Sequence, residues 1–214
     1  MHGLRCDPML LGWTRLLDEW VVGLTRYNRD ASTEPVCWEE RGTTLLTLAD
    51  AATRVRSFAY REAEIEPTVP LEDATMSFEL QGRVYRVAAE QHWPSTAEAM
   101  ADSASERLER AQVRARDAAS DEELAVGVLF ITPRWVPSRP AMDLLEAANT
   151  FIGASRAIRC GGCAFSFPDA HELARYRYGN TEHPGALLFV EAVTGRRECF
   201  DLKKMEHVLF SFDE

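Results

Sequence analysis

The sequence has few cysteines, a deficit of basic residues and no long apolar run. Its 214 residues include five cysteines, an odd number that suits reduced thiols better than a disulfide framework. No stretch approaches the roughly 18 consecutive apolar residues of a membrane span. The N-terminal segment MHGLRCDPMLLGW is followed by Arg15, Asp18 and Glu19 rather than by the apolar region of a signal peptide. These absences predict a cytoplasmic protein that makes no use of a membrane.

The excess of acidic over basic residues also limits the kinds of molecule that the chain could bind. Lysine and arginine total 24 against 34 aspartates and glutamates, which gives a net charge of −10. Such a surface repels duplex nucleic acid unless a basic patch compensates locally, so direct nucleic-acid binding is disfavoured and a basic protein partner is favoured. The sequence also has no P-loop, no GxSxG element and no Ser-His-Asp or Cys-His grouping that spacing alone supports.

The chain is long enough for one hydrophobic core, and 46% hydrophobic with 27% charged residues is typical of a globular protein. Apolar residues recur at steps of three and four between Met9 and Leu24, which predicts an amphipathic helix beginning at Asp7-Pro8 and ending near Asn28. A second helix is expected after Gly42. We therefore expect a single domain, 1–214, with a helical part over 1–56 and an α/β core over 57–214.

The rest of the chain alternates between strand and helix patterns. Continuous apolar runs over 124–132 and 186–193 are typical of central, buried strands. The order of elements predicts an α/β fold, a three-layer-like domain with a mixed central sheet flanked by helices. The expected elements are strands over 57–65, 76–80, 84–88, 124–132, 157–167 and 186–193, and helices over 95–119 and 141–155.

The centre of this order is a β-hairpin that leads into a long helix. Gln81-Gly82 separates two short strand-like runs and suits the turn. The residues Gln91 to Pro94 are expected to end the second strand. Ser95, with Glu98 three residues later, has the spacing of a capping box and is the predicted N-cap.

The local sequence VAAEQHWPS, Val87 to Ser95, resembles a motif of the PD-(D/E)XK nuclease-like family that is written V-E-A-K-Q-x-W-P-S. The resemblance implies a restriction-endonuclease-like core. In active members, an acidic residue on the first hairpin strand and the Glu and Lys of E-x-K on the second converge on a divalent metal that activates a water. Those positions fall on Thr75, Ala88 and Glu90, and none keeps the expected residue.

The resemblance therefore implies a degenerate nuclease scaffold with no catalytic residue, no metal and no cofactor. A Thr hydroxyl and an Ala methyl cannot replace two anionic oxygen ligands. The alternative is a divergent metal-dependent nuclease, in which Asp73 or Glu79 would act with Glu90 to rebuild the metal site.

Two segments are candidate partner-binding surfaces. Alternating carboxylates lie on one side of a strand and concentrate negative potential there. A Trp next to arginines is typical of binding hot spots. The candidate residues are Glu62, Glu64, Glu66, Glu72 and Asp73 beside the hairpin, and Arg134 and Trp135 in a proline-rich loop.

An acidic scaffold that lacks the catalytic residues of a nuclease suits a binding protein. Our leading hypothesis is an immunity protein that binds a basic protein toxin, such as a nuclease effector delivered by type VI secretion in bacterial competition, and gains fast association from electrostatic steering. The alternatives are the divergent nuclease and a non-catalytic subunit of a defence or phage-derived assembly.

Two further patterns have structural interpretations that we prefer. Arginines 107, 110, 114 and 116 are expected on a solvated helix face, which is also where nucleic acid would bind if the chain binds any. Cys160-Gly161-Gly162-Cys163 is expected to be a Gly-Gly bulge between small buried residues. A thioredoxin-type pair, or a zinc site completed by Cys199 with His171, His183 or His207, are the alternatives.

Overall fold

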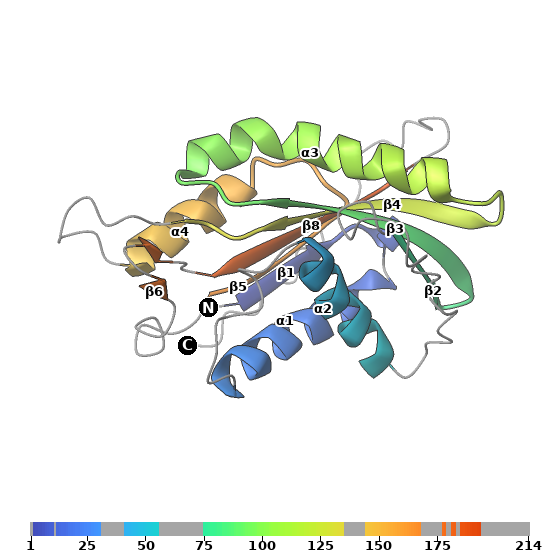
Figure 1. Cartoon of the computed structure of the whole chain (residues 1–214), viewed down its shortest axis with the longest axis horizontal. Coiled ribbons are helices and arrows are strands. Elements are labelled where there is room, and N and C mark those ends of the chain that lie inside the picture. Colours follow the sequence, from blue (N-terminus) through green and yellow to red (C-terminus); the bar gives the residue numbers. More distant parts are fainter. Residues whose placement is uncertain are drawn as a thin grey trace.

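A six-stranded mixed sheet forms the middle layer of the chain (Figure 1). The computed structural model describes residues 2–10, 12–30, 41–55, 75–134, 144–167, 177–178, 181–182 and 185–193. Within these ranges the sheet order is β1-β5-β8-β4-β3-β2, and only the β3–β4 pair is parallel. The sheet strands are β1 His2–Cys6, β2 Thr75–Leu80, β3 Arg83–His92, β4 Glu123–Ile131, β5 Gly162–Ser166 and β8 Ala186–Ala192. Two short strands, β6 Arg177–Tyr178 and β7 Thr181–Glu182, pair separately.

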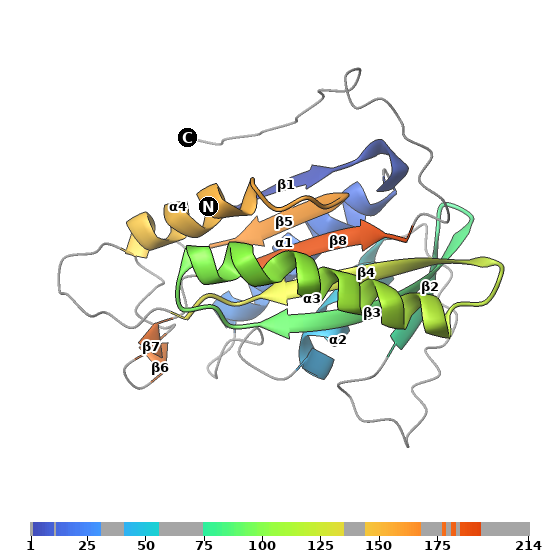
Figure 2. The ribbon, with the colours of Figure 1, turned by 90° about the horizontal axis from the view of Figure 1, so that it is seen from above.

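Helices cover both faces of the sheet, which confirms the predicted α/β class with a mixed central sheet. The helices are α1 Trp13–Asp30, α2 Arg41–Arg54, α3 Ala97–Ala118 and α4 Leu144–Ser155. In Figure 1, α1 and α2 lie below the sheet and α3 and α4 above it. Viewed from above in Figure 2, α3 runs over β3 and β4. None of the helices described is both long and apolar enough to span a membrane.

Each face of the sheet has its own hydrophobic core. On the α1 and α2 side, Trp13 and Trp20 pack among the apolar side chains of β3, β4 and β8. On the α3 and α4 side, Met100, Leu108 and Phe151 pack on Leu129 and other residues of β4, β5 and β8. Alternate residues of β4 and of β8 belong to the two cores, which is why the runs predicted over these central strands are continuously apolar.

The N-terminus differs from the helical part that the sequence predicts for residues 1–56. His2–Cys6 form β1, which pairs antiparallel with β5, and the Asp7 N–H donates to the Gly161 carbonyl at 2.6 Å. Pro8–Leu10 make one 3-10 turn, and α1 begins only at Trp13. The periodicity identified the buried side of α1 correctly, but the Asp7-Pro8 start was wrong because pairing with β5 keeps the preceding backbone extended.

The hairpin is confirmed, but its second strand is longer than predicted. Gln81 and Gly82 both have positive φ, 52° and 76°, as a two-residue type I′ turn requires. β3 continues through Gln91 and His92 because it pairs with β4 as far as Ile131, whereas the sequence had these residues ending the strand. The helix that follows is capped by Thr96, not Ser95: the Thr96 Oγ1 accepts from the Ala99 N–H at 3.1 Å.

Close contact between α3 and the sheet depends on small residues. Three of the five buried residues of α3 are alanines: Ala104, Ala111 and Ala115. Below them, Gly127 of β4 leaves no room for a side chain: a Cβ there would lie 2.6 Å from the Gln112 backbone N and 2.9 Å from the Leu108 carbonyl O. The helix therefore lies directly on the β3–β4 pair, where its long side chains reach the end of β3.

Candidate functional site

The candidate site lies where β3 passes under α3, at the positions that the nuclease resemblance singles out. Thr75 on β2 pairs with Ala88 on β3, and Glu90 follows two residues later on the same face. Ala88 packs against Ala115 of α3 and Ala125 of β4. Small, uncharged side chains therefore occupy the two positions that the resemblance assigns to metal-binding acids.

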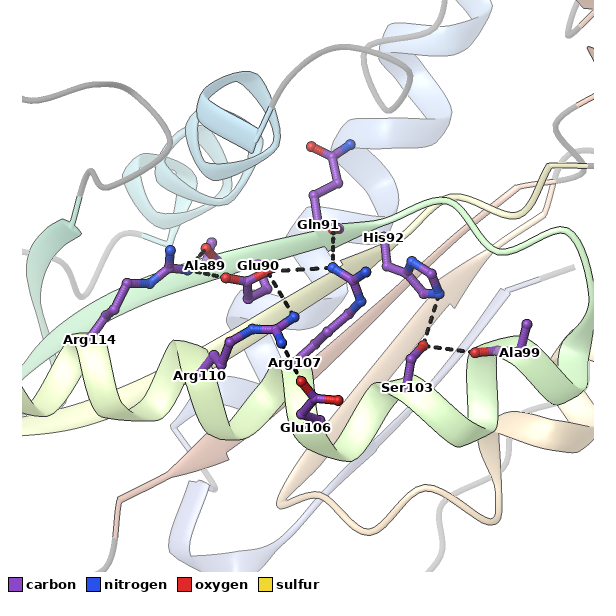
Figure 3. A network of polar contacts seen from close by, with 10 residues as sticks. All are labelled: Ala89, Glu90, Gln91, His92, Ala99, Ser103, Glu106, Arg107, Arg110 and Arg114. Atoms are coloured by element: carbon purple, nitrogen blue, oxygen red, sulfur yellow. Dashed lines mark hydrogen bonds and ion pairs between the residues drawn. The ribbon is translucent and has the colours of Figure 1, made fainter.

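Glu90 is a buried carboxylate surrounded by three arginines of α3, as Figure 3 shows. Its side chain is 6% exposed, and its Oε1 lies 2.8 Å from the Arg114 Nη2. Its Oε2 lies 3.7 Å from the Arg107 Nη1 and 3.9 Å from the Arg110 Nη2. Arg114 also donates to the Ala89 carbonyl, and Arg107 donates to the Gln91 carbonyl at 3.4 Å. The cluster fastens α3 to the backbone and side chains of β3.

This geometry makes Glu90 a structural counter-ion. A carboxylate that faces three guanidinium groups sits in a positive field, which is the reverse of what a divalent cation needs. Glu79 cannot complete a metal site with Glu90 either: Glu79 pairs with Val84, six residues before Glu90, so the two lie about 20 Å apart along the strand. Asp73 lies outside the described residues. Within the described part of the chain, no three His, Cys, Asp or Glu residues are grouped so that they could hold a metal ion.

The predicted solvated row of arginines is wrong for Arg107 and Arg114, which are half-buried, and right for Arg110 and Arg116, which are exposed. Residues 107, 110 and 114 are three and four positions apart and share the side of α3 that faces β3. Their side chains are 29%, 47% and 26% exposed. Arg116 alone is exposed away from the cluster. The sequence contained the signal: Glu90 is a charge on a buried strand, and such a charge requires partners.

His92 makes a further contact between β3 and α3, one turn of α3 before Arg107. Its Nε2 lies 2.9 Å from the Ser103 Oγ, which also donates to the Ala99 carbonyl at 2.8 Å. Burial lowers the pKa of His92, and the neighbouring Arg107 lowers it further. The imidazole is therefore neutral at pH 7 and belongs with Glu90 to the polar seam between β3 and α3.

A second carboxylate, that of the half-buried Glu123, joins the β2, β3 and β4 strands. The Ser77 hydroxyl donates to it, the Ser120 N–H donates to its Oε2 at 2.9 Å, and the Arg86 Nη2 lies 3.1 Å from its Oε1. Burial raises the pKa of Glu123, but these hydrogen bonds and the Arg86 charge outweigh it and bring the pKa below its ordinary value of 4.5. Glu123 is thus ionised at neutral pH, and its oxygens have hydrogen-bond partners.

Glu123 should make the stability of the protein depend on acid pH. A carboxyl whose pKa is lower in the folded state stabilises above its unfolded pKa, and this contribution is lost as the pH falls through the folded pKa. Glu123→Gln should therefore reduce the free energy of unfolding at pH 6, and the deficit should shrink towards about pH 3. Urea denaturation of both proteins at the two pH values checks this. An equal deficit at both values would contradict the ionised state of Glu123.

Most of the partner-binding residues predicted from the sequence cannot be placed. Glu62, Glu64, Glu66, Glu72, Asp73 and Trp135 all lie outside the described residues. Arg134 is described: it is exposed, its N–H donates to the Pro94 carbonyl at 2.8 Å, and its guanidinium carbon lies 5.4 Å from the Trp93 ring centre. The Arg134 side chain thus stacks on an aromatic ring of its own chain.

An acidic surface that the sequence analysis overlooked runs along the outer side of α3. Four exposed carboxylates lie at steps of four, four and three residues, and they therefore share one side of the helix. Val113, 42% exposed, follows one turn later. We call this surface the acidic stripe, and it consists of Glu98, Asp102, Glu106 and Glu109.

Comparison of the chain with protein-family models, with curated proteins and with solved structures finds no match. The resemblance to the nuclease-like family therefore rests on Val87 to Ser95 and the hairpin before it.

The Cys160–Cys163 segment does not form the predicted bulge. β5 pairs without interruption from Gly162, so the predicted bulge is wrong. At Gly161 a Cβ would lie 2.8 Å from the Leu10 Cδ1, the end of a side chain that can shift. Burial raises the pKa of both thiols, which opposes a thioredoxin-type role. The residues proposed to complete a zinc site, Cys199, His171, His183 and His207, lie outside the described residues.

Proposed function

We propose that this chain is a non-catalytic, protein-binding inhibitor: an immunity protein that neutralises a cognate bacterial toxin, such as a nuclease effector, by direct binding in the cytoplasm. The observation that carries the proposal is the Glu90 cluster. The place where a nuclease-like scaffold would hold its metal and lysine is filled by an internal ion pair, with Ala88 and Thr75 at the two acidic positions. On this proposal the scaffold is restriction-endonuclease-like and is kept for binding.

The charge distribution supports a basic partner. The chain carries a net charge of −10, and the acidic stripe presents four exposed carboxylates on a single side of α3. A toxin that acts on nucleic acid has a positive surface, and complementary charge raises the rate of association. The acidic run from Glu62 to Asp73 remains a candidate for the same role.

The proposal is tested by isolating the partner from the source cells. The tagged chain is used as bait, the bound proteins are identified by mass spectrometry, and each is assayed for DNA cleavage. We expect a stoichiometric basic partner that cleaves DNA alone and is silenced when the chain is added back. Cleavage of DNA by the purified chain itself, dependent on Mg²⁺ or Mn²⁺ and accompanied by no partner, would favour the divergent nuclease instead.

The acidic stripe gives the same experiment a matched pair of variants. Glu109→Lys reverses one charge within the stripe, and Asp18→Lys reverses one exposed charge on α1, across the sheet. With the partner in hand, Glu109→Lys should slow association by about tenfold at low salt and lose this effect at high salt, because exposed charges are screened. Equal slowing by both variants would assign the effect to net charge and not to the stripe.

A further inference from the structure

The arginines around Glu90 have more hydrogen-bond donors than the carboxylate can use. Three guanidinium groups carry about fifteen N–H donors, whereas one carboxylate offers about four acceptor positions. Only Arg114 approaches Glu90 at 2.8 Å, while the 3.7 and 3.9 Å separations of Arg107 and Arg110 exceed the roughly 3.2 Å of a hydrogen bond. The Arg107 Nε is buried with no hydrogen-bond partner among the described residues.

The cluster around Glu90 also carries a net positive charge, whereas the chain as a whole is negative. Arg107, Arg110 and Arg114 contribute three positive charges, and Glu90 and Glu106 contribute two negative ones, which leaves one positive charge in a chain of −10. Arg107 is 29% and Arg110 is 47% exposed, so part of each side chain is open to solvent. Figure 3 shows both side chains extending from α3 towards β3 beside one another.

We propose that Arg107 and Arg110 form an anion site that binds the phosphate group of a small phosphorylated molecule, with Glu90 and Arg114 as its fixed base. Planar guanidinium forks match the geometry of phosphate oxygens and bind them through paired, charge-assisted hydrogen bonds. The site goes beyond the proposed inhibitor function and does not rest on it.

The charges around Arg107 and Arg110 favour a small phosphorylated molecule over a nucleic-acid strand. Arg110 pairs with Glu106, which belongs to the acidic stripe, and the stripe continues along α3 in both directions. A nucleic-acid strand that followed the helix would place successive phosphates against these carboxylates, which repel it. A single phosphomonoester dianion at the two arginines would meet only Glu106 of the stripe, which is already paired with Arg110.

The test is a titration of the full chain with inorganic phosphate and with phenyl phosphate, followed through the arginine Nε–H signals in ¹⁵N NMR spectra. We expect saturable shifts for Arg107 and Arg110. Arg107→Gln and Arg110→Gln should each weaken binding by about tenfold, since each removes charged hydrogen bonds. Arg107→Lys, which keeps the charge and the fold but loses the fork, should weaken it by about threefold or more.

The control is Arg116→Gln, because Arg116 lies nine residues from Arg107 and so about half a turn around the helix from it. This variant should bind phosphate as the unchanged chain does. Shifts that stay linear, that sodium chloride reproduces at equal ionic strength, or that Arg116→Gln reduces equally would overturn the site. Tighter binding of a single-stranded oligonucleotide than of phenyl phosphate at the same salt would overturn the ligand class.

Discussion

Replacing Glu90 by Ala should destabilise the protein by about 3 kcal/mol, which is the largest effect we expect from a single charged residue. Removing one partner of a buried ion pair costs about 3–5 kcal/mol because the remaining charge loses its compensation. Here three guanidinium groups would face one another under α3, but each is between a quarter and a half exposed and can turn partly to water. Urea denaturation followed by far-UV circular dichroism measures the loss.

The control for this prediction is Glu106→Ala. Glu106 also pairs with Arg110, four residues on, but its side chain is 74% exposed. Exposed pairs of this kind contribute about 0.5 kcal/mol or less. If the two variants lost the same stability, Glu90 would not be the counter-ion that holds α3 to β3. A test of catalysis that removes Glu90 therefore needs a stability measurement beside it.

Replacing Gly127 by Ala should cost about 3 kcal/mol, at the upper end of what overpacking a core usually costs. The new Cβ would meet the Gln112 backbone N at 2.6 Å and the Leu108 carbonyl O at 2.9 Å. Neither is the end of a flexible side chain, so α3 itself has to move away from β4. We expect a lower melting temperature and a weaker Arg114–Glu90 contact, which is visible as a shifted Arg114 side-chain signal.

Replacing Gly153 by Ala should have the opposite effect on the stability of the protein. Gly153 lies in α4, and a Cβ at this position would meet no atom within 4 Å. Gly153→Ala should stabilise the protein by about 0.5–1 kcal/mol, because glycine is a poor residue inside a helix. A destabilising Gly153→Ala, or a neutral Gly127→Ala, would contradict the packing of α3 and α4 on the sheet.

The sequence predicted the strands and turns whose own residues form a distinctive pattern. The apolar runs of β4 and β8 are continuous because both faces of the sheet are covered, and the Gln81-Gly82 turn specifies its hairpin locally. β1 has no such signal: it is five residues long, contains Gly3 and Arg5, and is a strand only because β5 lies beside it. Pairing partners that are more than 150 residues apart in the chain cannot be inferred from a local pattern.

The nuclease resemblance pointed to Thr75, Ala88 and Glu90 as the candidate site, but it did not indicate which contacts these residues make. In the structure Thr75 lies opposite Ala88, and Glu90 lies on the same side of β3 as Ala88. The sequence did not predict the ion pairs, because the spacing of residues 107, 110 and 114 shows that they share a side of α3 but not what that side faces. The packing of α3 on the sheet decides that this side faces Glu90.

The most direct test of the account is a Mn²⁺ titration of the purified chain, followed by paramagnetic broadening of its backbone amide signals. The account holds that an internal ion pair occupies the place of a nuclease metal, so the amides of Ala88, Ala89 and Glu90 should show no saturable broadening. Saturable broadening confined to these residues and reversed by a chelator, together with cleavage of DNA by the same sample, would contradict it.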